Sequence, residues 1–93
     1  MAGQAQPQYG VSNVAVERDY VALARQRGAF LYRVVADHRE GGRGCVAHYI
    51  DESRDAARRR AFGLALCYRA SNATVEEIDV TSGEARPAQE LAS

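Results

Sequence analysis

The chain has 93 residues, enough for one folded domain but too few for two. An apolar content of 46% and a charged content of 26% are typical of globular proteins and argue against a disordered chain. The longest apolar run, residues 62–68, is far shorter than the ~20 residues of a membrane-spanning helix, and residues 1–10 lack the pattern of a signal peptide. We therefore expect a cytoplasmic protein with no membrane partner, in which Cys45 and Cys67 stay reduced.

The formal net charge is zero, but the charges are unevenly placed along the chain. All twelve basic residues are arginine, and eleven of them lie in residues 18–69 against six acidic residues, a net charge of +5. Residues 74–93 carry five acidic residues against one arginine, a net charge of −4. Such a division predicts either pairing within the fold or two surfaces suited to different partners.

The N-terminal third predicts a tail followed by a helix. Residues 1–10 are rich in glutamine, alanine and glycine and are typical of a disordered tail. Residues 11–27 predict a helix that Ser12 or Asn13 caps and that ends before Gly28. Its expected apolar stripe consists of Val16, Tyr20, Leu23 and the stem of Arg27. A short strand through residues 14–16 is the alternative.

Residues 29–50 carry the pattern of a β-hairpin. In residues 29–38 the side chains of Phe30, Tyr32, Val34 and Ala36 alternate onto one face of a strand. The glycine-rich residues 39–44 form the turn, and residues 45–50 resume as a second strand.

A second helix is predicted from the cap residue Ser53 to about residue 70. Its expected core stripe is Ala57, Ala61, Leu64 and Tyr68. Residues 74–80 predict a third strand, and residues 82–93 a flexible acidic tail. We therefore expect a single α+β domain over residues 11–81, with a three-stranded antiparallel sheet of order 2-1-3, an N-terminal helix, and a longer helix packed on one face.

Candidate catalytic and metal-binding groups are few. His38, Cys45, His48 and Cys67 are the only soft metal ligands in the chain. Cys45 and His48 are three residues apart on a strand, so their side chains are expected on opposite faces of the sheet. The glycine turn joins two strands, whereas a phosphate loop joins a strand to a helix. The sequence therefore predicts no metal, no cofactor and no catalytic residue, and thus a binding protein.

The second helix also carries residues that the core stripe does not use. Phe62 and Leu66 lie nearly opposite that stripe, so they are either covered by the first helix or form a protein contact, for which a homodimer seam is one option. Arginines surround them, and two more arginines flank the tip of the hairpin. The predicted partner-binding residues are Arg39, Arg43, Arg58, Arg59, Phe62, Leu66 and Arg69. The alternative is nucleic-acid binding by the same arginines, although the isoelectric point of about 6.7 is low for that function.

The layout of residues 31–80 consists of a hairpin, a serine-capped alanine-rich helix, and a strand reading Thr-Val-Glu-Glu-Ile-Asp-Val. This layout resembles small phage-encoded inhibitors of the anti-CRISPR type. The resemblance covers about half of the chain and is one of pattern, without a signature motif. It implies a stoichiometric inhibitor that docks on a host protein or ribonucleoprotein complex and has no catalytic residues.

Overall fold

The computed structural model describes residues 13–89 of the chain, with side chains from Val16 onward. The first predicted tail, residues 1–10, lies outside the described residues. The elements in chain order are α1 (Asn13–Arg27), β1 (Phe30–Asp37), β2 (Arg43–Asp51), α2 (Arg54–Cys67), a 3-10 turn η1 (Arg69–Ser71), β3 (Thr74–Ile78) and β4 (Ala85–Pro87). Where residues 14–16 left a choice between helix and strand, the structure has helix.

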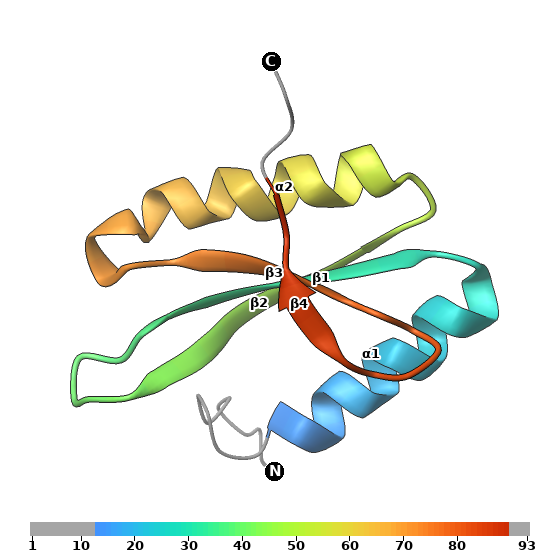
Figure 1. Cartoon of the computed structure of the whole chain (residues 1–93), viewed down its shortest axis with the longest axis horizontal. Helices are drawn as coiled ribbons and strands as arrows, with labels where there is room; N and C mark the ends of the chain where they lie inside the picture. Colours follow the sequence, from blue (N-terminus) through green and yellow to red (C-terminus); the bar gives the residue numbers. More distant parts are fainter. Residues whose placement is uncertain (1–12, 90–93) are drawn as a thin grey trace, which may run out of the picture.

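The four strands form one antiparallel sheet of order β2-β1-β3-β4 (Figure 1). The α+β class and the order 2-1-3 were predicted, but the expected number of three strands is wrong. The fourth strand, β4, lies within the stretch for which the sequence predicts a flexible tail, and it pairs with β3. Three residues ending in Pro87 are too short a run to show the alternation by which strands are recognised.

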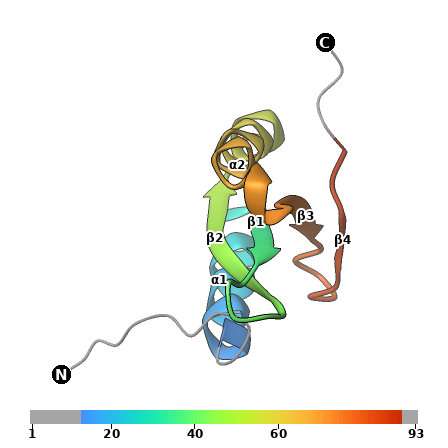
Figure 2. The same ribbon diagram turned by 90° about the vertical axis from the view of Figure 1, so that its left-hand side faces the viewer.

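The two helices cover opposite faces of the sheet. Figures 1 and 2 show α2 on one face and α1 on the other, with the sheet between them. With 15 residues against 14, α1 is slightly longer than α2, contrary to the prediction that the second helix is the longer one. Because the sheet separates the helices, α1 does not cover Phe62 and Leu66 of α2.

The core on the α2 side combines large sheet residues with small helix residues. Tyr32 and Val34 of β1 are fully buried there, as the predicted alternation requires. The helix contributes its alanines, and the fully buried members are Ala57 and Ala61. One member of the predicted stripe is wrong, since Tyr68 is 39% exposed, and the stripe omits Ala65, which is buried. Helix α2 ends at Cys67, and the non-helical φ of −112° at Tyr68 turns that residue away from the core.

The core on the α1 side is smaller. Val21 and Ala24 of α1 are buried against Leu31 of β1 and Ile78 of β3. The predicted apolar stripe of α1 is wrong in part: Tyr20 is half-buried and packs on this cluster, but Val16 and Leu23 are 46% and 40% exposed. Glu17, on the side of the helix that packs, forms the polar contacts described below.

Local signals place the turns where the sequence predicts them. Ser53 caps α2, since its hydroxyl accepts a hydrogen bond from the amide of Ala56 at 3.2 Å. Gly28 follows α1 with a φ of +65°, and Asn72 ends the 3-10 turn with a φ of +56°. Among the described residues, no helix is both long and apolar enough to cross a membrane.

Candidate functional site

A β-bulge in β2 overturns one prediction about the chemistry of this chain. Val34 pairs with Ala47, and the next residue, Val35, pairs with Cys45, so that Val46 is an extra residue in β2. Since an extra residue reverses the alternation of a strand, Cys45 and His48 lie on the same face. The Sγ atom of Cys45 is 3.6 Å from Nδ1 and 3.7 Å from Nε2 of His48. The expected placement on opposite faces is therefore wrong.

A polar network surrounds this pair between α1 and the sheet. Glu17 of α1 lies 2.9 Å from Nε2 of His48 and accepts two hydrogen bonds from Nη1 of Arg33 at 2.8 and 2.9 Å. The guanidinium of Arg33 also donates to Glu76 of β3 at 2.7 Å. The His48 side chain is only 7% exposed, and its ring stacks at a tilt on Tyr20 with centroids 4.7 Å apart. The network therefore joins α1, β1, β2 and β3.

The charges in the network stabilise one another. Burial alone would raise the pKa of Glu17, but hydrogen bonds from His48 and Arg33 outweigh it and hold that pKa below its ordinary value. Burial would likewise lower the pKa of Arg33, but hydrogen bonds to Glu17 and Glu76 raise it. Both groups are consequently ionised at neutral pH, which suits a structural tie between α1 and the sheet.

The thiol of Cys45 is poorly suited to nucleophilic chemistry. Burial, reinforced by the negative charge of Glu17, raises the pKa of Cys45 to about 11. A thiol with such a pKa is almost entirely protonated at neutral pH, whereas the thiolate is the nucleophile and the metal ligand. Within the described part of the chain, no three histidine, cysteine or acidic side chains are placed to hold a metal ion.

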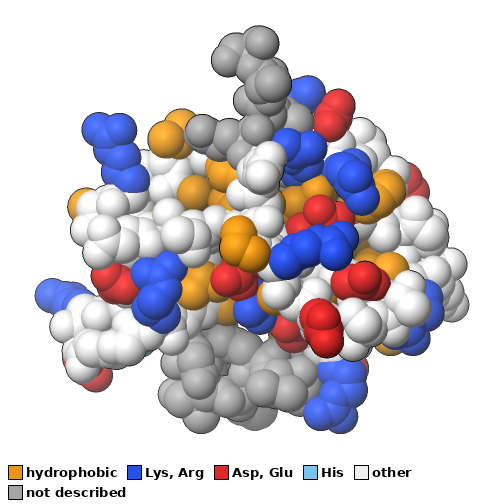
Figure 3. Space-filling model, in the orientation of Figure 1, with side chains coloured by type: hydrophobic (Ala, Val, Ile, Leu, Met, Phe, Trp, Pro, Cys, Tyr) orange, Lys and Arg blue, Asp and Glu red, His pale blue; other side chains and the backbone are white. Residues whose placement is uncertain are grey.

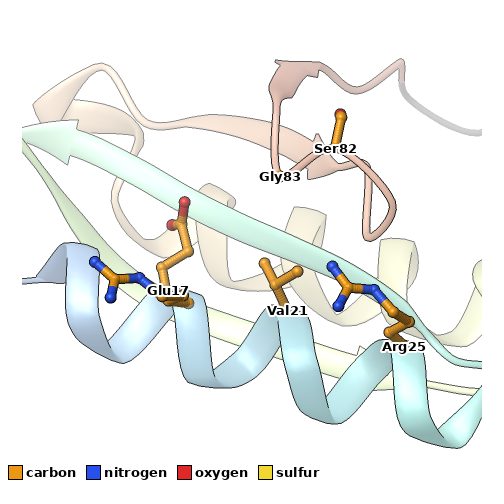
Figure 4. A pocket seen from close by; sticks show the side chains of 6 residues that line it. Glu17, Val21, Arg25, Ser82 and Gly83 are labelled. Atoms are coloured by element: carbon orange, nitrogen blue, oxygen red, sulfur yellow. The ribbon is translucent and has the colours of Figure 1, made fainter.

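A hollow of about 300 Å³ opens beside this network, between α1 and the turn that joins β3 to β4. Figure 4 shows Glu17, Val21 and Arg25 pointing from one side of α1 toward Ser82 and Gly83. Arg25 spans the gap, and its Nε donates to the carbonyl of Val80 at 2.9 Å. The hollow is thus crossed by a contact that ties α1 to the end of β3.

The outer side of α2 carries exposed apolar and basic residues together. Leu66 is 65% exposed, and Tyr68 directly after the helix is 39% exposed. Arg59 lies two turns before Leu66 on the same side of the helix, and Arg69 follows Tyr68; both are exposed. The guanidinium of neither arginine forms an ion pair or hydrogen bond with any described residue. Figure 3 shows hydrophobic and arginine side chains next to one another along α2.

The hairpin adjoins the same end of α2. A hollow of about 290 Å³ separates them, with Arg39 and Val46 on the hairpin side and Tyr68 and Ser71 on the helix side. The amide of Asn72 donates to Asp37 at 2.6 Å and holds the two elements together. We call the surface formed by Arg39, Arg59, Leu66, Tyr68 and Arg69 the α2–hairpin surface. It contains four of the predicted binding residues.

The other three predicted residues have contacts inside the fold. Arg43 forms an ion pair with Asp37 at 2.6 Å and donates to Thr74 at 2.9 Å, so its guanidinium is held beside the sheet. Arg58 donates to the carbonyl of Gln89 at 2.6 Å and holds the segment after β4 against α2. Phe62 is half-buried and packs on the core cluster beneath α2.

Sequence reasoning missed two features of this region. The network around Glu17 joins residues from α1 and three strands, and no local pattern relates them. Tyr68 was assigned to the core because the helix was expected to continue to residue 70. The stretch Tyr68-Arg69-Ala70-Ser71-Asn72 does contain the signal of an earlier end, since Ser and Asn are favoured where helices stop.

In comparisons with protein-family models, with curated proteins and with solved structures, no match to this chain was found.

Proposed function

We propose that this chain is a non-enzymatic protein-binding module that docks through the α2–hairpin surface. One observation carries the proposal: Leu66 is a large apolar side chain, 65% exposed, on a helix side where it contributes nothing to the core. An apolar residue of this size beside an exposed tyrosine and two arginines has the composition of an interface hot spot.

The charges around Leu66 select the kind of partner. Arg59 and Arg69 are exposed and form no ion pair with the described residues, so their full charge faces outward. Arg39 adds a third positive charge across the hollow between hairpin and helix. We expect a protein partner with an apolar side chain that inserts beside Leu66 and Tyr68, and with acidic residues around it.

The specific form of this proposal is a stoichiometric inhibitor, encoded by a phage or mobile element, that occupies a surface of a host protein or ribonucleoprotein complex. It is supported by the layout of hairpin, alanine-rich helix and strand. A small rigid domain that buries an alanine-lined helix against a sheet presents its outer helix side without rearrangement, which favours tight docking.

The experiment compares Leu66→Asp with Leu23→Asp as a matched control, because Leu23 is a 40% exposed leucine on α1, across the sheet. Tagged chains are incubated with nuclease-treated host lysate, and captured proteins are quantified by mass spectrometry and then titrated as purified components. We expect a partner that binds the unchanged chain and Leu23→Asp, and binds Leu66→Asp at least ~10-fold more weakly. A partner that binds Leu66→Asp as well as the control would contradict the assignment of this surface.

The same experiment separates protein binding from nucleic-acid binding. A parallel capture uses lysate without nuclease treatment. If proteins are captured only from that untreated lysate, the purified chain is titrated with duplex and single-stranded nucleic acid at two salt concentrations. Binding that falls steeply with salt and is lost in an Arg59→Glu/Arg69→Glu variant would replace the protein proposal with a phosphate-binding one.

A further inference from the structure

The two edges of the sheet differ in how they are protected. At one edge, β4 has only three residues and ends in Pro87, features that prevent further strand pairing. At the other edge, β2 has nine residues, and among the described strands it pairs with β1 alone. Between its terminal residues, Arg43 and Asp51, β2 contains no proline, lysine, arginine or acidic residue. Such an edge is a template for another strand. Figure 2 shows β2 at the margin of the sheet, opposite β4.

One side of α2 follows this open edge. The guanidinium carbon of Arg60 lies 5.4 Å from the centre of the Tyr49 ring of β2, which places this side of the helix over the edge strand. Ala56, Gly63 and Cys67 share that side with Arg60, so three of its four residues are small.

Among the described residues, no contact requires a glycine at position 63. A glycine in a helix interior is less favourable than alanine, and a Cβ atom placed at Gly63 would meet no atom within 4 Å. Its backbone is not in the left-handed region that favours glycine. A close approach by a second helix is a physical reason for glycine at this position.

We propose that two copies of this chain pair edge to edge through β2, in antiparallel orientation, to form one continuous eight-stranded sheet. The bulge at Val46 breaks the regular pattern, so pairing is confined to residues 47–51 and centred on Tyr49. Strands in a sheet lie about 4.8 Å apart, and α2 lies over β1 and β2 and also contacts β3, so the two α2 helices would lie side by side on the order of 10–13 Å apart. Packed helices are ~8–10 Å apart, and small residues on the facing sides let two helices meet without a steric clash.

The charges at this edge are complementary to a second copy. In the register centred on Tyr49, Asp51 of the second copy lies opposite Ala47, on the sheet face that α2 covers. Arg60 lies over Tyr49 and forms no ion pair with the described residues. Asp51 likewise has no cationic partner among the described residues. Its carboxylate accepts a hydrogen bond from the backbone amide of Ser53. Two-fold symmetry would create this Arg60–Asp51 contact twice.

Sedimentation equilibrium of the full chain over a dilution series tests the proposal. We expect the unchanged chain to form a dimer, and Gly63→Gln and Arg60→Glu each to raise the dissociation constant at least ~10-fold. The double variant Arg60→Glu/Asp51→Arg should restore the dimer, because the charge pair is exchanged. Arg86→Glu, the same charge change at an exposed position of β4 on the opposite edge of the sheet, is the matched control and should dimerise normally.

Circular dichroism shows whether each variant is folded, and Gly63→Gln should be at least as stable as the unchanged chain because glutamine favours a helix. A monomer at every concentration would overturn the proposal. So would a dimer unaffected by both edge variants. A dimer that only Leu66→Asp disrupts would overturn it too, since the α2–hairpin surface would then be the seam.

Discussion

Glu17 is the residue of α1 on which the placement of that helix most depends, and its substitution by glutamine should destabilise the protein clearly. The carboxylate is 18% exposed and contacts two partners, Arg33 and His48. A hydrogen bond to a charged group typically contributes ~1.5–3 kcal/mol. Because Arg33 keeps its second partner, Glu76, the guanidinium is not left unpaired, and we expect a loss of about 2 kcal/mol in the free energy of unfolding. In a domain of this size that lowers the melting temperature by about 10 °C.

The assay is urea unfolding of Glu17→Gln at neutral pH, with Glu52→Gln as the matched control. Glu52 also pairs with an arginine, Arg27, but both side chains are largely exposed, so its loss should change stability little. If Glu17→Gln unfolds at the same urea concentration as the control, the network does not hold α1 as described.

Acid adds a second test of the Glu17 contact. Its pKa in the folded chain is lower than in the unfolded chain, where it is near ~4.3. The carboxylate therefore contributes its stability above the unfolded pKa and loses it as the pH falls through the folded pKa. The difference in stability between the unchanged chain and Glu17→Gln should be present at neutral pH and shrink as the solution is acidified through the folded pKa of Glu17. A difference that persists at low pH would contradict an ionic origin.

Three further outcomes follow from the structure. Iodoacetamide at neutral pH should label the exposed Cys67 at least ~10-fold faster than Cys45, whose pKa is raised to about 11 by burial, as peptide mass spectrometry would show. Deleting Val46, the extra residue of the bulge, should leave a folded chain, whereas deleting Tyr49 should shift the pairing of β2 with β1 and unfold the chain. Circular dichroism distinguishes these results, and equal loss of structure in both deletions would contradict the described β1–β2 register. Ala61→Leu should cost about 1–3 kcal/mol in urea unfolding, because Ala61 is fully buried; an unchanged midpoint would mean that α2 packs less closely than described.

Features set by neighbouring residues could be predicted from the sequence. The alternation of Phe30, Tyr32 and Val34 placed three side chains on the face that α2 covers. Gly41 and Gly42 at the hairpin both have positive φ values, 105° and 79°, which explains why the turn is glycine-rich. Ser53 caps its helix as expected. Each of these depends on steric and hydrogen-bonding preferences within a few residues, which the sequence states directly.

Features set by tertiary contacts could not be predicted. On α1, Val16 and Leu23 of the predicted stripe are exposed, whereas Glu17 faces the sheet and engages Arg33 and His48 across 16 and 31 residues of sequence. The periodicity of apolar residues predicts which side of a helix is buried, but it does not indicate that a charged side chain will be paired inside the fold. The candidate site shows the same limit, since contacts with atoms distant in sequence hold the guanidinium groups of Arg43 and Arg58 within the fold, although Arg43 stays 39% exposed.

The bulge in β2 shows how one unpaired residue changes a chemical conclusion. The sequence predicts that Cys45 and His48 lie on opposite faces of the sheet. In the structure the bulge at Val46 places both side chains on the same face. The resulting pair would resemble a nucleophile and its base if distance alone were considered. Its thiol pKa of about 11 and the tie between His48 and Glu17 indicate a structural role instead. Geometry therefore has to be weighed together with ionisation.

The alanine-lined inner side of α2 connects the fold with the proposed binding surface. Only alanines of this helix are buried, so the helix lies close to the large residues of the sheet, Tyr32 and Val34. The large residues Phe62 and Leu64 of this helix are only half-buried and pack at the margin of the contact. Large apolar residues such as Leu66 must then serve another purpose or weaken the solubility of the monomer. The exposure of Leu66 next to arginines without ionic partners among the described residues is the feature that the proposed binding role would account for.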